Sequence, residues 1–306
     1  MNIGVDLGGT KIEAVALDSA GAERARLRVP TPRGDYHGTV AAIRDLVLGI
    51  EGKLGARATV GVGTPGAVSP ATGLMKNCNS TWLNGTALDR DLAAALERRV
   101  RLANDADCFA LSEAIDGAGE GAGVVFGVIV GTGTGGGIVV DGKLLSGPNA
   151  IAGEWGHNPL PWPVGRESPG EPCYCSRTGC IETFLSGPGM SRDHLEASGA
   201  RLSAAEIVRG AEDGDREAAA TITRYAERMG RALASVINII DPDVIVLGGG
   251  MSNLPGLVER VPELWRPWVF SDRVDTRLVK ARHGDSSGVR GAARLWDRGL
   301  GRLAAP

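Results

Sequence analysis

The stretch DLGGTK, residues 6–11, follows one strand pattern and precedes another. Apolar residues alternate over 3–7 and again over 12–17, so we expect two strands joined by a tight hairpin loop. Asp6 ends the first strand, and two glycines turn the chain beneath a threonine and a lysine. Successive glycine N–H groups and a threonine hydroxyl can surround phosphate oxygens, and a carboxylate can hold Mg²⁺ through water. The stretch therefore predicts either an ordinary tight turn or a phosphate site.

A second glycine-rich loop, GTGTGGG at 131–137, lies between an apolar run at 124–130 and a strand pattern at 138–140. It contains G-x-G-x-x-G, but a dinucleotide-binding loop needs a helix after the glycines, and a strand with an Asp-Gly turn follows here. The P-loop pattern G-x-x-x-x-G-K-[ST] is absent from the sequence. A lone glycine run is more often a flexible turn. Two such hairpin loops, one in each half, favour a pair that grips the β- and γ-phosphates of ATP.

Composition excludes several classes of function. The 306 residues carry 33 basic and 36 acidic side chains, so the formal charge of −3 gives no electrostatic footprint for nucleic acid or an anionic membrane. The apolar runs are shorter than the roughly 18 residues of a membrane span. The first residues enter a strand pattern without a secretory signal, so we expect a cytoplasmic protein.

Hydrophobic periodicity predicts an α/β protein with mixed sheets. Residues 146–190 are rich in proline and are expected to be loop-like, and Ser203 and Glu206 have the spacing of a capping box. Helices are expected over residues 40–54, 88–100, 215–240 and 286–296, and the second of these would be capped by Asp89 or Asp91. Two more helices should begin at NDAD (104–107), ending near residue 115, and at residue 203. Strands are expected at 60–63 and 244–247.

The stretch DGAGEGAG at 116–123 is where we expect a boundary between two domains, because it is rich in glycine and poor in bulky side chains. The small N-terminal domain would span 1–117 and the large domain 118–285. A final helix at about 286–298 would pack back on the first domain.

Three of the five cysteines, Cys173, Cys175 and Cys180, lie within eight residues, and His157 precedes them. An odd number of cysteines in a chain without a secretory signal disfavours a disulfide framework. Three thiolates and one imidazole form the closed tetrahedral set of a structural Zn²⁺ site. We therefore expect a zinc-binding loop over 157–180, against the alternative of buried free cysteines.

These motifs resemble the two phosphate motifs and, in LGGG at 247–250, the adenosine motif of the actin–hexokinase superfamily. Within it the chain resembles the ROK family of bacterial sugar kinases. The family's zinc signature, C-x-C-G-x-x-G-C-x-E, is matched by CYCSRTGCIE at 173–182, with Ser176 in place of the first signature glycine. The resemblance implies a two-domain actin-like ATPase (ribonuclease H-like) fold with an active-site cleft between the domains. It also implies ATP, Mg²⁺ and a structural Zn²⁺ as cofactors.

The resemblance assigns roles to individual residues. Asp105 would be the catalytic base, although an Asp at a strand–helix junction is by itself more often a helix cap. The implied sugar ligands are Gly66, Asn79, Asn104, Asp105, Glu154, His157 and Glu182. The implied nucleotide and Mg²⁺ ligands are Asp6, Gly8, Gly9, Thr10, Lys11, Gly131, Thr132, Gly133, Thr134, Gly135, Gly248, Gly249 and Gly250. His157 would bind zinc through one ring nitrogen and turn the other toward the sugar.

Three stretches, 76–85, 154–162 and 280–293, look most like the manno(fructo)kinase branch of the family. We therefore expect ATP-dependent phosphorylation of D-fructose at its 6-hydroxyl, with mannose as a second substrate. The alternatives are a ROK glucokinase, an N-acetylglucosamine or N-acetylmannosamine kinase, and a sugar-sensing regulator without catalysis. Regulators of the family carry a helix-turn-helix segment ahead of a DLGGT-type motif, whereas the motif starts at residue 6 here. The presence of Asp6 and Asp105 also disfavours a sensor without catalysis. The expected partners are a hexose and ATP, and a homodimer is left open.

Overall fold

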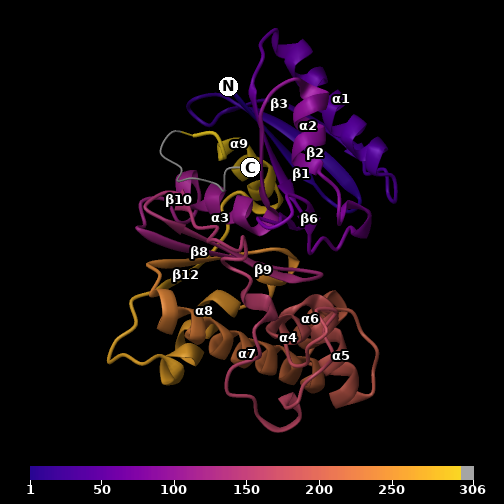
Figure 1. Ribbon diagram of the computed structural model, residues 1–306. Helices are drawn as coiled ribbons and strands as arrows, with labels where there is room; N and C mark the ends of the chain where they lie inside the picture. Colours follow the sequence, from indigo (N-terminus) through magenta and orange to yellow (C-terminus); the bar gives the residue numbers. More distant parts are fainter. Residues whose placement is uncertain (298–306) are drawn as a thin grey trace. The chain divides into compact units, whose positions relative to one another are not determined.

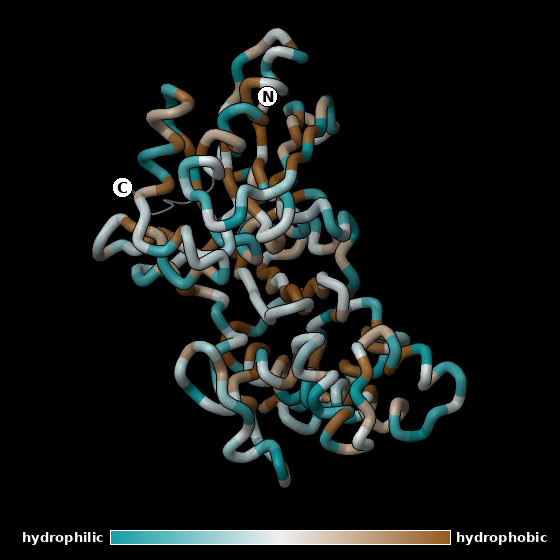
Figure 2. The backbone as a smooth tube through the Cα atoms, turned by 90° about the vertical axis from the view of Figure 1, so that its right-hand side faces the viewer, coloured by the Kyte–Doolittle hydropathy of each residue, from teal (hydrophilic) through white to brown (hydrophobic). Residues whose placement is uncertain are grey.

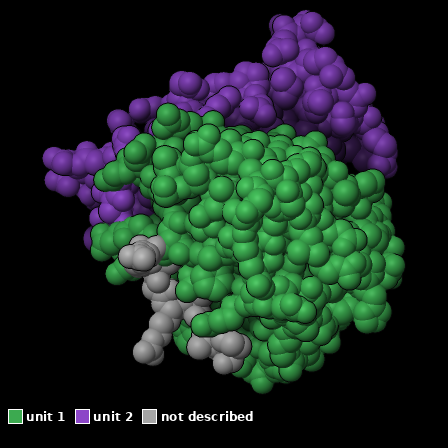
Figure 3. All heavy atoms as spheres, turned by 90° about the horizontal axis from the view of Figure 1, so that it is seen from above, with its two compact units in different colours: residues 1–121, 137–152, 282–306 green, residues 122–136, 153–281 purple. Residues whose placement is uncertain are grey.

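The computed structural model describes residues 1–297, which fall into two compact units. Unit 1 contains residues 1–121, 137–152 and the chain from 282 onward, and unit 2 contains residues 122–136 and 153–281 (Figure 3). Residue 298, the last of the expected final helix, lies outside the described residues. Among the described residues, no helix combines the length and apolar character that a membrane span needs.

A five-stranded sheet in the order β3-β2-β1-β4-β7 forms the centre of unit 1 (Figure 1). The antiparallel strands are β1 (Asn2–Leu7), β2 (Lys11–Leu17) and β3 (Glu23–Pro30), and β4 (Thr59–Thr64) and β7 (Val100–Asn104) run parallel to β1. The other elements are α1 (Tyr36–Leu54), α2 (Leu88–Leu96), α3 (Asp105–Asp116), α9 (Ser287–Arg294) and the short pair β5 (Ala67–Val68) and β6 (Met75–Lys76).

The two faces of this sheet have different cores, because successive strand residues point to opposite sides. Ile12, Ala14 and Ala16 of β2 belong to the larger core, which includes buried residues of α1 and α2. Val15 and Leu17 belong to a second core, with residues of α9. In Figure 2 the hydrophobic residues accordingly gather inside the unit.

Helix α9 packs so closely on its neighbours that certain positions must be glycine. A Cβ on Gly61 of β4 would lie 2.0 Å from the Ala292 carbonyl oxygen, and one on Gly291 would lie 1.6 Å from the Cys108 carbonyl oxygen of α3. Both distances are far inside van der Waals contact, so these glycines let α9 approach the backbone of β4 and of α3.

A second five-stranded sheet has the order β10-β9-β8-β11-β12. Its strands are β8 (Val124–Val130), β9 (Thr134–Val140), β10 (Lys143–Leu144), β11 (Val244–Gly248) and β12 (Arg277–Lys280). Strands β8, β11 and β12 are parallel, β9 and β10 are antiparallel, and the division between the units falls within β9. The presence of two mixed sheets confirms the predicted α/β class.

Helix α7 (Arg216–Ile240) contacts the other helices of unit 2. These are α4 (Ile181–Leu185), α5 (Gly187–Ser198), α6 (Ala204–Glu212) and α8 (Leu257–Trp265). The 3-10 turns of the two units are η1 (Thr81–Leu83), η2 (Trp155–His157), η3 (Gly165–Glu167), η4 (Gly250–Asn253), η5 (Arg266–Trp268) and η6 (Gly284–Ser286).

Several local expectations are corrected. The loop expected over 146–190 ends early, because α4 and α5 begin inside it; Pro188 falls in the first turn of α5, where a missing N–H is tolerated. Helix α2 stops at Leu96 because Glu97 takes a left-handed conformation with φ 51°. Its cap is Ala87, and Asp89 and Asp91 instead occupy its first turn, where the helix dipole favours negative charge. The capping box of Ser203 and Glu206 is confirmed.

Candidate active site

The first glycine loop lies between β1 and β2 and is held at three points of its backbone. The Gly8 N–H donates to the Lys11 carbonyl at 3.1 Å, and the Thr31 hydroxyl donates to the Gly8 carbonyl at 2.7 Å. The Arg33 guanidinium donates to the Gly9 carbonyl at 2.8 Å. Arg33 was not predicted from the sequence, because nothing in the TPRGDYH stretch (31–37) relates it to a loop more than twenty residues earlier.

Asp6, at the end of β1, carries the most perturbed carboxyl group of this loop. Its burial, and then the neighbouring Glu13 carboxylate, raise its pKa to about 6, while Lys11 acts in the opposite direction. A Cβ on Gly288, in the first turn of α9, would lie 3.8 Å from the Asp6 carboxyl group. A partly buried carboxylate beside a second negative charge suits a divalent cation, so Asp6 fits the Mg²⁺ role that the sequence suggested.

Asn104 and Asp105 lie where β7 ends and α3 begins. The Asn104 side chain is the N-cap, and its oxygen accepts the Ala106 N–H at 2.9 Å. Asp105 occupies the first turn of α3, where the positive end of the helix dipole stabilises a carboxylate. The cap expected of an Asp in this segment is therefore made by Asn104, and the roles of both residues in substrate binding and catalysis remain predictions.

Gly66 and Asn79 lie in one region of unit 1. A Cβ on Gly66 would lie 2.4 Å from the Lys76 carbonyl oxygen, so the turn after β4 touches the end of β6. Asn84 shapes the next residues, because its side chain accepts the Cys78 N–H at 2.8 Å and donates to the Cys78 carbonyl at 3.0 Å. Asn79 is exposed on the resulting loop. Asn84 was not singled out from the sequence.

In unit 2 the second glycine loop and the LGGG motif lie together. Strands β8 and β11 are parallel with Ile129 opposite Gly248, so both motifs follow the carboxyl ends of neighbouring strands. Gly249 has φ 80°, and a Cβ there would lie 2.3 Å from the Val130 carbonyl oxygen. Ligands of α/β sheets bind at this end of the strands. The arrangement brings together the predicted second phosphate loop and the predicted adenosine motif.

The EWGH motif packs on the second glycine loop. The buried Trp155 indole N–H donates to the Gly135 carbonyl at 3.0 Å, and its ring meets Phe126 edge to face with centroids 5.7 Å apart. A Cβ on Gly156 would lie 2.0 Å from the Thr134 carbonyl oxygen. The two middle residues of the motif are thus structural, and they fix the segment that carries Glu154 and His157.

The four predicted metal ligands are brought together: the ligand atoms of His157, Cys173, Cys175 and Cys180 all lie within 4.8 Å of one another. The Cys175 and Cys180 sulfurs are 3.5 Å apart, and the Cys173 sulfur lies 3.6 Å from His157 Nδ1. Tetrahedral zinc, with bonds of about 2.3 Å to sulfur and about 2.0 Å to nitrogen, requires separations of about 3.6–3.8 Å. The donor set and its spacing therefore fit Zn²⁺.

Since Nδ1 of His157 faces the thiols, Nε2 is the nitrogen that could turn toward a sugar. In the structure Nε2 lies 2.9 Å from the Tyr174 hydroxyl, and the two rings are perpendicular with centroids 5.0 Å apart. Tyr174 is itself 72% exposed. Sequence reasoning treated this residue as a spacer of the C-x-C signature and missed the contact.

A buried ion-pair network anchors the segment before the cysteines. Arg231 forms two bonds to Glu167, and Arg228 bridges Glu167 and Asp193 at 2.8 Å each. Burial acts to raise the pKa of Glu167, but the two guanidinium groups hold it below its ordinary value. The network joins η3 to α5 and α7. Because Glu167 lies between His157 and Cys173, the network holds this segment of the chain against α5 and α7.

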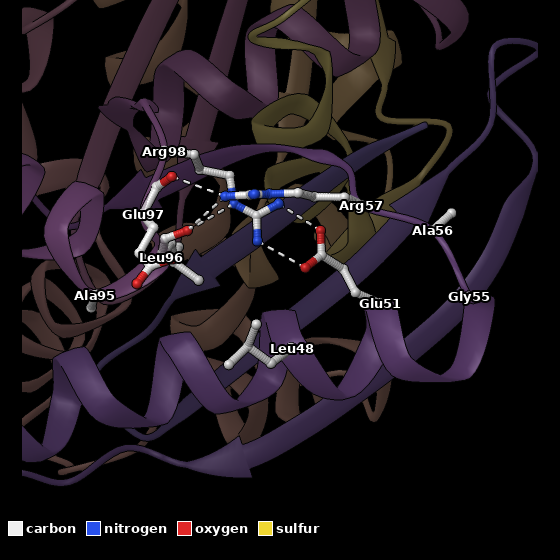
Figure 4. A pocket seen from close by; sticks show the side chains of 9 residues that line it. All are labelled: Leu48, Glu51, Gly55, Ala56, Arg57, Ala95, Leu96, Glu97 and Arg98. Atoms are coloured by element: carbon white, nitrogen blue, oxygen red, sulfur yellow. Dashed lines mark hydrogen bonds and ion pairs between the residues drawn. The ribbon is translucent and has the colours of Figure 1, made fainter.

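One surface hollow of unit 1 contains no predicted site residue. It is lined by Leu48, Glu51, Gly55, Ala56, Arg57, Ala95, Leu96, Glu97 and Arg98 (Figure 4). Its polar groups satisfy one another, because Arg98 pairs with Glu51 and Arg57 donates to the Glu97 carbonyl at 2.9 Å. The hollow is therefore a packing contact between α1 and the end of α2.

The predicted site residues thus form local groups within each unit. Unit 1 holds the first glycine loop, the pair at the start of α3 and the Gly66–Asn79 region, and unit 2 holds the second glycine loop, the LGGG motif, the EWGH motif and the cysteine cluster. Such a set, two glycine hairpins and an adenosine-type motif on mixed sheets, defines an actin-like ATPase fold.

Comparisons with known proteins give the family. The ROK family profile matches residues 2–299, and the chain belongs to the ROK family. An N-acetyl-D-glucosamine kinase of Escherichia coli O127:H6 is 39% identical over 303 residues, covering 96% of this chain and 99% of that protein. Similar solved structures include two from the family. A ROK hexokinase from Thermus thermophilus has a TM-score of 0.85 and 32% identity, and the match covers 95% of this chain and 96% of that chain. A ROK family glucokinase from Streptomyces griseus, in complex with glucose and AMPPNP, has a TM-score of 0.78 and 28% identity, and the match covers 96% of this chain and 98% of that chain.

These findings confirm the predicted fold and the ROK family resemblance. They do not single out the manno(fructo)kinase branch. The relative quoted above is an N-acetyl-D-glucosamine kinase, which was one of the alternatives.

Proposed function

We propose that this chain is an ATP-dependent kinase that phosphorylates N-acetyl-D-glucosamine at its 6-hydroxyl. The observation that carries the proposal is the 39% identity to an N-acetyl-D-glucosamine kinase over nearly the full length of both chains. The fructose reading rests on three local stretches only, so a similarity that spans the whole chain outweighs it. Fructose, mannose, glucose and N-acetylmannosamine remain the competing substrates.

In the proposed reaction Asp105 accepts the proton of the 6-hydroxyl while the sugar oxygen attacks the γ-phosphorus of ATP, and ADP leaves. Its place at the start of α3, directly after the end of β7, supports this role, because ligands of α/β sheets bind at the carboxyl ends of the strands. Asn104 caps the same helix and fixes the backbone that presents Asp105.

The phosphates would be held by the glycine N–H groups and threonine hydroxyls of the two loops, with Asp6 as the residue that holds Mg²⁺. When bound, Mg²⁺ neutralises charge on the transferred phosphoryl group. The Thr134 hydroxyl is buried and has no hydrogen-bond partner within the described part of the chain. A phosphate oxygen would supply the acceptor that this hydroxyl lacks.

The sugar hydroxyls would be bound by Glu154, His157 and Glu182. Both His157 and Glu182 are tied to the cysteine cluster. His157 is one of its four ligand residues, and Glu182 lies in the first turn of α4, whose N-cap is Cys180. A closed Cys₃His site has no open coordination position, so Zn²⁺ there would fix the shape of this segment and leave the chemistry to Asp105.

A coupled assay of ADP release tests the proposal on N-acetylglucosamine, N-acetylmannosamine, glucose, mannose and fructose. We expect the highest kcat/KM with N-acetylglucosamine, because discrimination between sugars is a difference in transition-state binding. Asp105→Asn should lower kcat by about 10²–10⁴ and leave sugar binding intact, as removal of a positioned base does. A turnover of Asp105→Asn near that of the wild type would remove Asp105 from the mechanism. ADP release with none of the sugars would contradict the proposal as a whole.

A further inference from the structure

Glu182, proposed above as a sugar ligand, also bonds to the second phosphate loop. Its Oε2 accepts the Thr134 backbone N–H at 2.8 Å. The contact leaves no spare room, because a Cβ on Gly133 would lie 2.8 Å from the same oxygen. The carboxylate therefore contacts two residues of the loop directly, Thr134 by a hydrogen bond and Gly133 by close packing.

Both ends of this bond are held firmly. Glu182 lies in the first turn of α4, whose start is fixed by the Ile181 N–H donating to the Asn158 carbonyl at 2.9 Å. The loop is held at its other side by the Gly187 N–H, which donates to the Gly131 carbonyl at 2.8 Å. Both of these contacts thus come from residues that follow the cysteine cluster, Glu182 in α4 and Gly187 in α5.

We propose that Glu182 is a positioning residue for the nucleotide as well as a sugar ligand, so that one carboxylate couples the two substrates. This inference rests on the proposed function. By holding the Thr134 N–H, Oε2 keeps Gly131–Thr134 in the conformation that presents its other backbone N–H groups to phosphate. A sugar hydroxyl bound to the same carboxylate fixes its orientation, and thereby the loop. Binding of sugar and of nucleotide is then mutually favourable, and by the same factor in both directions.

The nucleotide arm of the test measures the affinity of AMPPNP with Mg²⁺ by calorimetry on the full chain without sugar. Glu182→Ala should weaken it by roughly ten- to hundredfold, the effect of losing one hydrogen bond to a charged acceptor. Glu182→Gln should stay within about threefold of the wild type, because its amide oxygen can still accept the Thr134 N–H. Equal losses in both variants, or no loss in Glu182→Ala, would overturn the proposal.

The sugar arm measures the affinity for N-acetylglucosamine without nucleotide and needs no change at Glu182. Gly133→Ala should weaken sugar binding severalfold, because its Cβ must displace the Glu182 carboxylate. Gly52→Ala in α1 is the control, since a Cβ there meets nothing within 4 Å and Gly52 belongs to neither predicted site. Equal sugar affinities in the two glycine variants would overturn the proposal even if Glu182→Ala failed to fold.

The two arms separate this inference from the proposed function. A protein that phosphorylates N-acetylglucosamine but fails both arms keeps its function and loses the coupling. A protein that phosphorylates no hexose loses the function, and the nucleotide arm still decides whether Glu182 holds the loop.

Discussion

Glu113→Gln should destabilise unit 1 strongly, because the Glu113 carboxylate organises the returning C-terminal segment. Glu113 is fully buried in α3, and each of its oxygens accepts two hydrogen bonds. Oε2 accepts the Ala118 and Arg282 N–H groups at 2.9 Å, and Oε1 accepts the His283 N–H at 3.0 Å and the Ser287 hydroxyl at 2.7 Å. These bonds attach residues 282–287, which lead into α9, to the end of α3.

A glutamine of the same shape has one carbonyl oxygen, and its amide nitrogen would face two donors. Two hydrogen bonds are lost, and partly buried donors lose their carboxylate acceptor, at about 1–3 kcal/mol for each. We expect a loss of about 2–6 kcal/mol at pH 7, a large part of the roughly 5–15 kcal/mol of a typical domain.

The effect should depend on pH with a definite sign. Burial acts to raise the pKa of Glu113, but the backbone bonds from Ala118, Arg282 and His283 and the Ser287 hydroxyl hold it below its ordinary value of 4.5. The carboxylate therefore contributes stability above pH 4.5, and this contribution is lost as the pH falls through the lower folded-state pKa. The difference between wild type and Glu113→Gln should shrink at acidic pH.

Urea unfolding followed by circular dichroism at pH 7 and at successively lower pH measures both effects. Glu120→Gln is the control, because Glu120 is exposed and pairs with Arg282 only at 3.6 Å, so it should change stability by less than about 0.5 kcal/mol. A Glu113→Gln protein as stable as Glu120→Gln at pH 7 would refute the reasoning.

Three further predictions concern the packing of glycines, the metal cluster and the backbone at Ser176. Gly291→Ala should cost at least about 3 kcal/mol in thermal unfolding, since its Cβ would meet the Cys108 backbone. Gly52→Ala in α1, where a Cβ meets nothing within 4 Å, should stabilise by about 0.5–1 kcal/mol; similar melting temperatures for the two would contradict this. Purified protein should contain about one zinc per chain by metal analysis, and Cys175→Ala should lose zinc, stability and sugar affinity together. Folded, active wild type without zinc would disprove the site. Ser176→Gly should stabilise by about 0.5 kcal/mol, because Ser176 has φ 70° where the family signature has glycine; a clear loss of stability would give the serine side chain a role of its own.

The features that the sequence predicted well are local. Alternating apolar residues around DLGGTK predict β1 and β2, and the spacing of His157 and the three cysteines predicts the cluster, because a tight turn and a short metal loop depend on neighbours in the chain. Periodicity likewise predicts α1 and α7.

The features that it missed depend on contacts between distant segments. The bond between Glu182 and Thr134 joins residues 48 apart, and Glu113 meets residues more than 160 positions away. No period or motif encodes such a pairing. The short helix α4, within a proline-rich stretch, was not predicted, because a helix of five residues has too few positions for a periodic pattern.

The central claim is most directly tested by competition for limiting ATP. Wild-type protein receives equal concentrations of N-acetylglucosamine and fructose, and mass spectrometry and NMR identify the products, whose initial ratio equals the ratio of kcat/KM. We expect N-acetylglucosamine 6-phosphate in at least tenfold excess. A tenfold excess of fructose 6-phosphate would contradict it and restore the fructokinase reading.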